Sequence, residues 1–429
     1  MKKRILLPLA AIAFLSTNNF DAQIRFTTTP AVANCIPLDI NNSGTLVGAI
    51  DTTIHFLWPK DGNFTTIGST LSGDNHLNTR IGEDNTKVIG FMRNPTTNLN
   101  EFSIYDTITQ TWSYLGGMGS MDNTSSSPYA VTSDNTTIVG LGWLPGGGAH
   151  AIKWTQGEGF QDLGAAFPSS YSRADAISDD KTLIGGYQDQ PNGARTGAYW
   201  KDGVQTIIKD ANNNFVGSVR AISYDGSKLV GNPLYGKYPY ILDVTTGVVK
   251  YIANLQLLGD PMYKGSANGI TNDGKTVIGY YNSTRPLTNI NESFIWSEEM
   301  GYKDFTAYIK SLGIDVQDEY LYATAISPDG LKIGGYTKTK KVFVVDISSY
   351  LATNNSTKTN VKVYPNPATN VLNISGLKAE TKINIYNVAG QLVKTSTSAQ
   401  IDINNLPKGN YVVSYEVDGK TTSQKFIKQ

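Results

Sequence analysis

The segment Ile270 to Gly279, with the sequence ITNDGKTVIG, decides the fold of this protein because variants of it recur along the chain. It begins with an apolar residue, continues through a polar turn that carries Asp and Gly, and ends in a short apolar strand and a glycine. The Asp side chain caps its own backbone in such a turn, and the residue after it tolerates a positive φ. The segment is therefore predicted to form a β-hairpin.

Six further segments follow the same pattern, and their final glycines are spaced 42 to 55 residues apart. They are Asp39 to Gly48 (DINNSGTLVG), Ile81 to Gly90 (IGEDNTKVIG), Val131 to Gly140 (VTSDNTTIVG), Ile177 to Gly185 (ISDDKTLIG), Ile222 to Gly231 (ISYDGSKLVG) and Ile326 to Gly334 (ISPDGLKIG). A period of this length accommodates four short strands per unit. Seven such units predict an all-β fold, a seven-bladed β-propeller over residues 23–350.

The strands after each hairpin support four strands per unit. A third strand is expected at segments such as His55 to Trp58 (HFLW), and a fourth at segments such as Phe160 to Gly164 (FQDLG). The seventh unit stops after its third strand, Val342 to Val345, whereas Ile24 to Thr29 (IRFTTT) stands alone before the first hairpin. We expect this N-terminal segment to complete the last blade, because closure removes the exposed sheet edges of an open array.

The N-terminus has the anatomy of a signal peptide. Three basic residues from Lys2 to Arg4 precede an apolar run from Ile5 to Leu15, which is too short to span a bilayer. Residues 1–22 are predicted to be removed by cleavage between Ala22 and Gln23. No other segment approaches the length of a transmembrane helix.

Composition narrows the fold and the partners. The 429 residues include 42 glycines and only 17% charged residues, a balance that favours short strands and tight turns over helices. The 36 Lys and Arg residues equal the 36 Asp and Glu residues in number, so no net field favours nucleic acid or an anionic membrane as a partner. The single cysteine, Cys35, has no partner for an internal disulfide and is interpreted as a structural thiol.

The repeat region resembles two families of repeats. The stretch His150 to Gly164 (HAIKWTQGEGFQDLG) resembles the HAF family of extracellular repeats, a resemblance that extends over roughly residues 24 to 350 although one copy alone keeps the full motif. Phe102 to Leu115 (FSIYDTITQTWSYL) and the double glycines at 185–186 and 334–335 are instead similar to kelch-type repeats. Either resemblance implies a propeller, and HAF-type repeats imply an extracellular address without a defined activity.

A second domain is expected after the polar stretch Leu351 to Asn360 (LATNNSTKTN), which is interpreted as a linker. About seven short strands separated by Asn, Gly and Pro turns predict a compact Ig-like β-sandwich over residues 361–429. They are Val361 to Tyr364, Val371 to Ile374, Ile383 to Tyr386, Leu392 to Lys394, Ile401 to Ile403, Tyr411 to Val417 and Ser423 to Ile427.

Three ordered motifs of this second domain carry a family resemblance: YPNP, YNVAGQLV and LPKGNY, followed by a closing KFIK. Together they resemble the type A C-terminal sorting domain of type IX secretion substrates. The resemblance implies that the domain directs the folded protein from the periplasm through the outer membrane, and that it is removed near the linker, with the cargo released or anchored at the surface. The motif residues are Tyr364, Pro365, Asn366, Pro367, Gly390, Gly409, Tyr411 and Lys425.

A search for chemistry yields no catalytic, metal or cofactor site. The three histidines, His55, His76 and His150, lack the spacing of a metal site, and no hydrolase elbow, metalloprotease helix or phosphate-binding loop is present. His55 and His150 lie in strand segments, where hydrogen-bonded or solvent-facing rings are expected. The Asp residues that recur in the hairpin turns are interpreted as turn formers because they repeat with the architecture.

The functional hypothesis is a secreted or surface-displayed binding module for a carbohydrate or a surface protein. The resemblance of the C-terminal domain implies the type IX secretion machinery as a partner. A hydrolase or lyase of polysaccharides or glycoconjugates is the alternative, and a structural surface component is a further one. Candidate catalytic residues for such an enzyme are Asp175, Arg173, Arg195 and Arg220, although surface ion pairs explain these charges more simply. Clustered carboxylates or arginines with shifted pKa values around a central channel would favour the enzyme.

Overall fold

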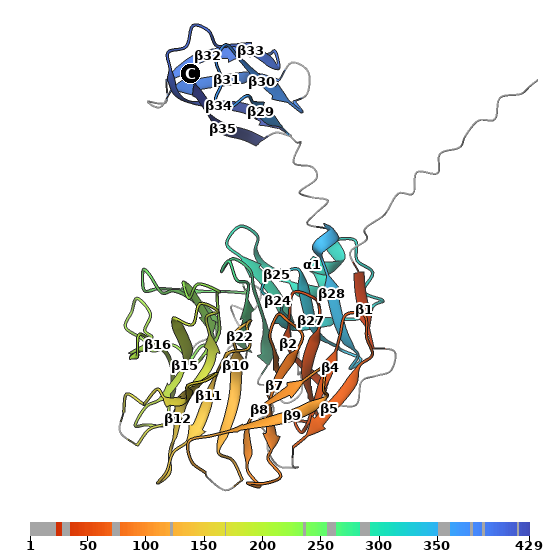
Figure 1. The fold of residues 1–429 in the computed structure, drawn as a ribbon, viewed down its shortest axis with the longest axis vertical. Helices are drawn as coiled ribbons and strands as arrows, with labels where there is room; N and C mark the ends of the chain where they lie inside the picture. The colour runs from red at the N-terminus through yellow and green to blue at the C-terminus, as the bar shows by residue number, and fades with distance from the viewer. Residues whose placement is uncertain are drawn as a thin grey trace, which may run out of the picture. The chain divides into compact units, whose positions relative to one another are not determined.

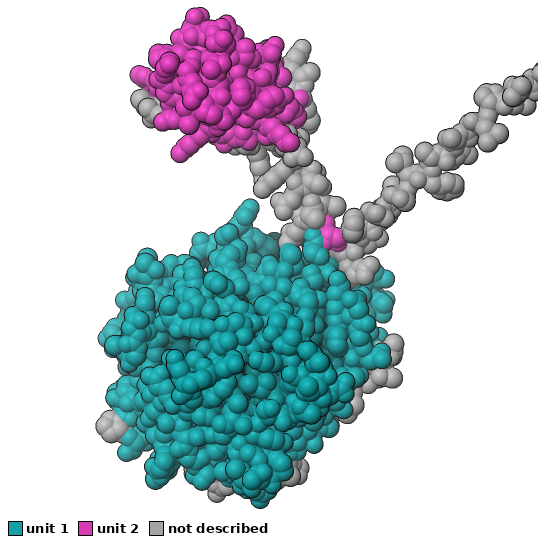
Figure 2. All heavy atoms as spheres, in the orientation of Figure 1, with its two compact units in different colours: residues 1–348 teal, residues 349–429 magenta. Residues whose placement is uncertain are grey.

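The chain forms two compact units in a computed structural model, residues 1–348 and residues 349–429 (Figures 1 and 2). The structure describes residues 23–27, 35–70, 78–120, 123–167, 169–234, 237–254, 263–283, 292–350, 361–377, 381–387, 391–417 and 420–429. Almost all of the described elements are antiparallel β-strands. The all-β prediction is therefore confirmed.

The described part of the first unit contains seven four-stranded antiparallel sheets. The first sheet consists of β2 (Cys35–Ile40), β3 (Leu46–Ile50), β4 (Ile54–Trp58) and β5 (Thr65–Ser69), and the second of β6 (Arg80–Ile81), β7 (Lys87–Arg93), β8 (Asn100–Asp106) and β9 (Thr111–Gly116). The third consists of β10 (Ser126–Val131), β11 (Thr137–Trp143), β12 (Ala149–Thr155) and β13 (Gly159–Asp162).

The remaining sheets follow in chain order. The fourth consists of β14 (Ser172–Ile177), β15 (Leu183–Asp189), β16 (Arg195–Lys201) and β17 (Val204–Ile207), and the fifth of β18 (Val219–Ile222), β19 (Lys228–Gly231), β20 (Tyr240–Asp243) and β21 (Val248–Tyr251). The sixth consists of β22 (Tyr263–Ile270), β23 (Val277–Ser283), β24 (Glu292–Ser297) and β25 (Gly301–Asp304). The seventh contains β26 (Leu321–Ile326), β27 (Lys332–Thr337) and β28 (Val342–Asp346).

The fourth strand of the seventh sheet comes from the other end of the chain. Strand β1 (Gln23–Phe26) pairs antiparallel with β28, with Ile24 opposite Val345. Arg25 ties β1 to the first sheet, because its guanidinium donates to the carbonyls of Pro59 and Gly44 at 2.6 Å and lies 4.2 Å from the centre of the Trp58 ring. The expected pairing of the N-terminal segment with the last repeat is therefore present.

The first strand of each sheet contacts the first strand of the next sheet. These contacts run through β2, β6, β10, β14, β18, β22 and β26, and β26 in turn contacts β2. Each of these strands therefore lies between two others of the same kind, and the array has no terminal member.

Six of these seven strands carry a β-bulge at the same place in the repeat. The unpaired bulge residues are Leu38, Tyr129, Asp175, Arg220, Asn268 and Thr324. The bulge explains the repeated glycine on the neighbouring strand: a Cβ at Gly140 would lie 2.1 Å from the carbonyl oxygen of Ser127, and one at Gly279 would lie 2.0 Å from that of Ser266. Only glycine allows this close approach of the two backbones.

The hairpin turns behave as the sequence predicts. In a representative turn, Asp225 Oδ1 accepts hydrogen bonds from the backbone N–H of Ser227 at 2.9 Å and from the hydroxyl of Ser223 at 3.0 Å. The equivalent carboxylates each accept from the backbone N–H two residues later; they are Asp84, Asp134, Asp180, Asp273 and Asp329. The structural interpretation of the repeated Asp is therefore confirmed.

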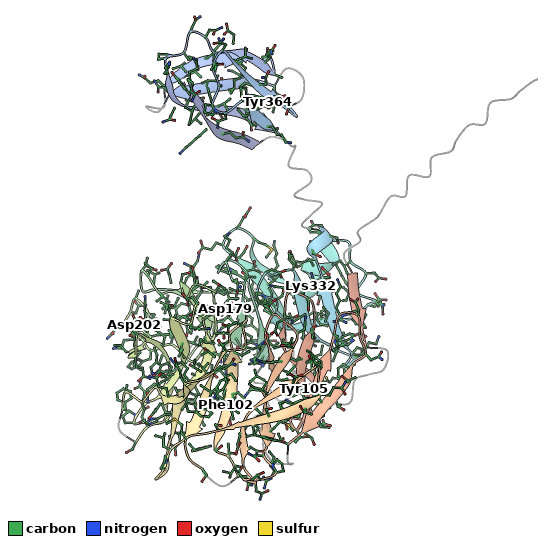
Figure 3. The ribbon with its side chains drawn as sticks, viewed as in Figure 1. Phe102, Tyr105, Asp179, Asp202, Lys332 and Tyr364 are labelled. Atoms are coloured by element: carbon green, nitrogen blue, oxygen red, sulfur yellow. The ribbon has the colours of Figure 1, made fainter. Side chains whose placement is uncertain are left out.

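The turns of successive sheets are also joined by hydrogen bonds. Each link involves the residue before the turn Asp or that Asp itself, and the linked residues are Asn42, Glu83, Ser133, Asp179 (labelled in Figure 3), Tyr224, Asn272 and Pro328. The last link returns to the first turn, because the backbone N–H of Asp329 donates to Asn42 Oδ1 at 2.9 Å. We call this set of links the turn ring.

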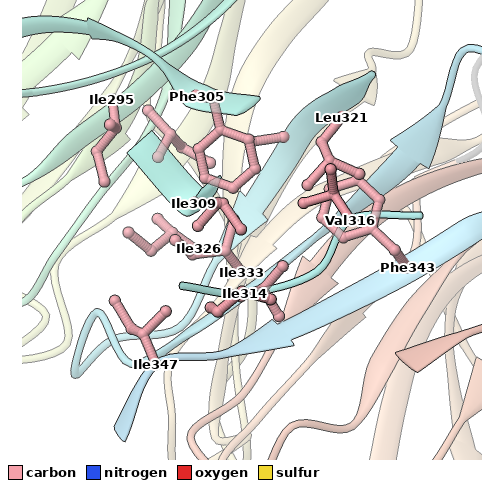
Figure 4. Close-up of a cluster of buried hydrophobic side chains, with 13 residues drawn as sticks. Ile295, Phe305, Ile309, Ile314, Val316, Leu321, Ile326, Ile333, Phe343 and Ile347 are labelled. Carbon is pink, nitrogen blue, oxygen red and sulfur yellow. The ribbon is translucent and has the colours of Figure 1, made fainter. Parts of the chain in front are cut away.

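One helix was not predicted from the sequence. Helix α1 (Phe305–Ser311) follows β25, and Asp304 caps it by accepting a hydrogen bond from the backbone N–H of Ala307 at 2.7 Å. Its side chains Phe305 and Ile309 are buried in a cluster that includes Phe343 of the seventh sheet (Figure 4). The helix covers an apolar flank of the last sheets, a tertiary role that the hairpin repeat does not encode.

The second unit contains a three-stranded and a four-stranded antiparallel sheet among its described residues. The first sheet consists of β29 (Lys362–Tyr364), β30 (Val371–Ser375) and β33 (Gln400–Asp402). The second consists of β31 (Ile383–Asn387), β32 (Leu392–Ser396), β34 (Gly409–Val417) and β35 (Lys420–Lys428). Leu372, Ile385 and Phe426 belong to one buried cluster drawn from both sheets. All seven expected strands are present.

Candidate functional site

The bulges place their side chains in a central cavity of about 390 Å³ within the first unit. All six bulge residues line it, and it is also lined by Ile36, Pro37, Asn78, Arg80, Tyr280, Asn282, Tyr322, Ala323 and Tyr336. Bulges redirect side chains and are common next to binding sites. We call this space the bulge cavity.

A second cavity of about 200 Å³ lies on the turn-ring side of the bulges. It shares five bulge residues and Arg80 with the bulge cavity, and its other walls include the turn-ring residues Glu83, Asp179 and Tyr224. Burial raises the pKa of Glu83 to about 6, against the hydrogen bond from Asn42, and the neighbouring Asp carboxylates raise it further. The two cavities therefore differ in charge. The smaller one, on the turn-ring side of the six bulge residues, is the acidic one.

Arg80 occupies a position that carries a small residue in most repeats. Its Nε donates to the carbonyl of Tyr129 at 2.7 Å and its Nη1 to that of Leu38 at 3.1 Å. Burial lowers the pKa of Arg80, against the charges of Asp39 and Asp175, and burial likewise raises the pKa of Asp39, against the charge of Arg80. Sequence analysis missed Arg80, although its departure from the small residue seen at Ala130 and Ala176 was a usable signal.

Asp175 is buried and is held by Arg173. The guanidinium of Arg173 contacts Asp175 Oδ1 through Nε at 2.9 Å and Nη2 at 2.8 Å. It also lies between two aromatic rings, 4.1 Å from the centre of Tyr129 and 4.7 Å from that of Tyr187, on whose ring Arg195 also lies at 4.7 Å. Burial lowers the pKa of Arg173, but the charge of Asp175, the two tyrosines and the hydrogen bond to Asp175 together outweigh it, so the pKa is raised. Three of the four residues weighed from the sequence thus form one stack.

Arg220, the fourth of those residues, is exposed and lines both cavities. The side-chain oxygen of Asn232 accepts from its Nε and Nη2 at 3.1 Å each, in the amide orientation that also satisfies Ser266. Arg220 is therefore oriented by a neutral partner rather than by an acid.

Three polar atoms on the wall of the bulge cavity are buried without a hydrogen-bond partner. They are Asp175 Oδ2, Asn282 Oδ1 and Thr324 Oγ1. Buried polar atoms in proteins are nearly always paired with protein or water. Because the three atoms have almost no accessible surface, they are closed off from the cavity, although their residues line it.

Tyrosines form the remaining wall of the bulge cavity. The ring centre of Tyr322 lies 5.2 Å from that of Tyr336 and 5.1 Å from that of Tyr320. Burial raises the pKa of Tyr322 and so keeps its hydroxyl protonated. The cavity therefore offers flat apolar faces together with amides and charges.

Neither His55 nor His150 lines the bulge cavity. His55 is buried, with Nδ1 2.7 Å from the hydroxyl of Thr79 and Nε2 3.1 Å from the carbonyl of Phe91, and burial lowers its pKa to about 4. His150 lies 3.0 Å from Asp162, whereas His76 lies outside the described residues. Cys35 is buried, which raises the pKa of its thiol to about 12. No cluster of three or more metal-ligating side chains occurs among the described residues.

The motif residues of the second unit come together at strand β35. Asn366 joins the YPNP segment to this strand, because its amide donates to the carbonyl of Lys425 at 3.3 Å and accepts from the N–H of Ile427 at 3.0 Å. Tyr364, labelled in Figure 3, and Lys425 are exposed, as are the prolines 365 and 367.

The other motif residues have structural surroundings. Tyr411 is buried against Phe426, with ring centres 5.6 Å apart, and its hydroxyl donates to the carbonyl of Pro407 at 2.8 Å. Gly409 begins β34. Gly390 and Ala22 lie outside the described residues, and Gln23 is the first residue of β1.

Comparison with solved structures finds only distant similarity. A protein assigned as TolB from Agrobacterium tumefaciens is 10% identical, with a TM-score of 0.41 over 56% of this chain and 83% of that one. An oligogalacturonate lyase solved with manganese is 14% identical, with a TM-score of 0.43 over 77% and 94%. A chain of a mitotic checkpoint complex is 13% identical, with a TM-score of 0.44 over 81% and 98%. Similarity at this level establishes no function.

No curated protein sequence matches the chain. Among the residues that the structure describes, no helix has the length and apolar character needed to cross a membrane. Residues 362–429 match the family model described as the secretion system C-terminal sorting domain. Such a tail implies interaction with the type IX secretion machinery and export to the cell surface or beyond it. Residues 362–429 of this chain are therefore a type IX C-terminal sorting domain.

Proposed function

We propose that the first unit is a seven-bladed β-propeller that binds a ligand outside the cell, in the bulge cavity at the centre of the ring. The seven four-stranded sheets, the cyclic contacts of their first strands and the pairing of β1 with β28 support this architecture. The resemblance to HAF-type and kelch-type repeats stays a prediction, as does the removal of residues 1–22.

One observation carries the binding role: the six bulge residues, which differ in chemistry from sheet to sheet, all line one cavity. The cavity volume of about 390 Å³ lies within the usual range for small-molecule sites.

The mixture of tyrosine faces and amide side chains favours a carbohydrate. Sugar rings present apolar C–H faces, which suit Tyr322 and Tyr336, and vicinal hydroxyls, which suit the amide side chains of Asn268 and Asn282. A glycan array with mature protein, residues 23–429, tests this function. We expect discrete glycan signals that the double variant N282A/T324V loses, and a blank array with the folded protein would contradict a carbohydrate role.

The sorting domain is proposed to dock on the secretion machinery through the exposed surface around Asn366. Tyr364, Lys425 and Ile427 are exposed, and apolar side chains together with a cation suit a protein partner. Deletion of 361–429 is expected to leave the protein in the periplasm. The variant Y364A/K425E should reduce export, whereas K394E on strand β32 should not; export by the deletion mutant would contradict the assignment.

A polysaccharide hydrolase or lyase is the second candidate, favoured by the presence of Asp39 and Asp175 on the wall of the smaller cavity. Because burial raises the pKa of Asp39, the two carboxylates have different environments, as an acid and a base require. Reducing-sugar release from mixed polymers tests this function. Release that is lost in D175N and retained in D162N would support an enzyme, and no release together with glycan binding would leave the binding module.

A further inference from the structure

We infer that the ligand of the bulge cavity is a sugar that carries a carboxylate, and that Arg220 binds this carboxylate. This inference rests on the proposed binding function and specifies its ligand class. Some charged side chains around the bulge cavity already form ion pairs within the chain, and others are available to a ligand.

Arg173 is not available to a ligand. Its guanidinium is paired twice with Asp175 Oδ1 and is enclosed between the rings of Tyr129 and Tyr187. The charge of Arg173 is therefore neutralised by Asp175 within the chain.

Arg220 differs from Arg80, because the charges of Asp39 and Asp175 act on the buried Arg80, whereas Arg220 forms no ion pair among the described residues. Arg220 contacts the neutral amide of Asn232, and Arg80 donates to backbone carbonyls of Tyr129 and Leu38. Arg220 is thus an exposed guanidinium on the wall of the bulge cavity that is held by a neutral amide, so its charge can pair with an anionic ligand.

The acids of the channel lie on the other side of the bulge layer. Asp39, Glu83 and Asp179 line the smaller cavity but not the bulge cavity. An anionic ligand is therefore repelled from the turn-ring side and attracted from the tyrosine side. With its carboxylate on Arg220, a sugar ring would lie among the other polar residues of this wall, which include Asn268 and Asn282.

The test is calorimetric titration of mature protein, residues 23–429, with D-glucuronate and with D-glucose, which differ in the carboxylate alone. We expect glucuronate to bind at least 10-fold more tightly than glucose, and its affinity to fall as salt is raised. R220Q should weaken glucuronate binding by about 10- to 100-fold, the range for one charge-assisted hydrogen-bonded contact. R220K should recover part of this loss because it keeps the charge without the planar fork.

The matched control is R195Q. Arg195 is exposed, belongs to the same stack of cations and tyrosines, and does not line the cavity, so its loss should change glucuronate affinity less than twofold. Equal binding of both sugars, unaffected by R220Q, would overturn the carboxylate inference and leave the binding function standing. Binding of neutral or sulfated glycans alone on the array would do the same. Absence of binding to every glycan would overturn both.

Discussion

The hairpin turns and the bulges lie only a few residues apart in the sequence of each repeat. The turn sequence is repeated from sheet to sheet, whereas the bulge residue changes. Six of the turns keep an apolar residue three positions before an Asp, as at Ile222 and Asp225. The bulge two residues before that apolar position is Leu, Tyr, Asp, Arg, Asn or Thr from one sheet to the next. The repeated residues are therefore those that form the hydrogen bonds of the hairpin turns, and the variable residues are those that line the bulge cavity.

This difference gives a rule for separating architecture from function in the first unit. A residue that repeats with the sheets, such as Asp225 or Gly140, should act on stability. A residue that departs from the repeat and faces the channel, such as Arg220 or Thr324, should act on binding. Substitutions in each class can test this division between stability and binding, and the largest effect is expected at the repeated glycines.

Substitution of Gly140 by Ala should cost about 4 kcal/mol of unfolding free energy, because the new Cβ meets a backbone oxygen at 2.1 Å and the bulge must move. Urea unfolding followed by tryptophan fluorescence measures this, since all six tryptophans lie between residues 58 and 296. G203N is the control, because Gly203 has a φ of +76° and open space around it. A cost no larger than that of G203N would refute the steric role of the repeated glycine.

Acid should destabilise the first unit through His55, a non-repeated residue that lies away from the channel. Its folded pKa of about 4 is below the ordinary value of 6.5, so the stabilisation is complete above pH 6.5 and is lost as the pH falls towards 4. The loss over this window should be about 3 kcal/mol. Unfolding at pH 7.5 and pH 4 should show a steeper decline for the wild type than for H55N, and parallel declines would contradict the buried neutral ring.

Removal of one turn carboxylate should have a smaller effect. D225A loses the hydrogen bonds from Ser227 and Ser223, which are worth about 1 kcal/mol at an exposed turn. Thermal unfolding measures the cost, and D202A, in a turn outside the repeat motif, provides the comparison. Unchanged stability in D225A would show that the repeated Asp is not needed for the turn.

The smallest expected effect on stability has the opposite sign. T324V replaces a buried hydroxyl that lacks a partner with a methyl of similar size, so the unfolding free energy should rise by up to about 1 kcal/mol. Glucuronate binding should weaken in the same variant. A loss of stability would mean that Thr324 belongs to the architecture and would break the division between the two regions.

Sequence analysis predicted the strands of the first unit well because each hairpin carries its own turn chemistry, as the DG pair at 225–226 illustrates. It also anticipated the pairing of β1, since the seventh repeat visibly lacks a strand. Helix α1 was missed because its apolar face is matched to a flank that forms only in the folded unit.

The candidate site was harder to predict for a physical reason. Asp175 and Arg220 were noticed as isolated charges, but surface ion pairs were the favoured explanation, because no short motif shows that bulges turn both side chains into one cavity. Arg80 and the tyrosines 280, 322 and 336 come from four strands of three sheets and meet only through the cyclic arrangement.

The most direct test compares R220Q and D225A, two variants five residues apart on one hairpin, by their dissociation constants for D-glucuronate. The division of roles predicts that R220Q weakens binding by about 10- to 100-fold while D225A leaves it unchanged at a temperature where both are folded. Equal affinities of the two variants, or a loss of binding in D225A alone, would contradict the assignment of the bulge layer as the binding site.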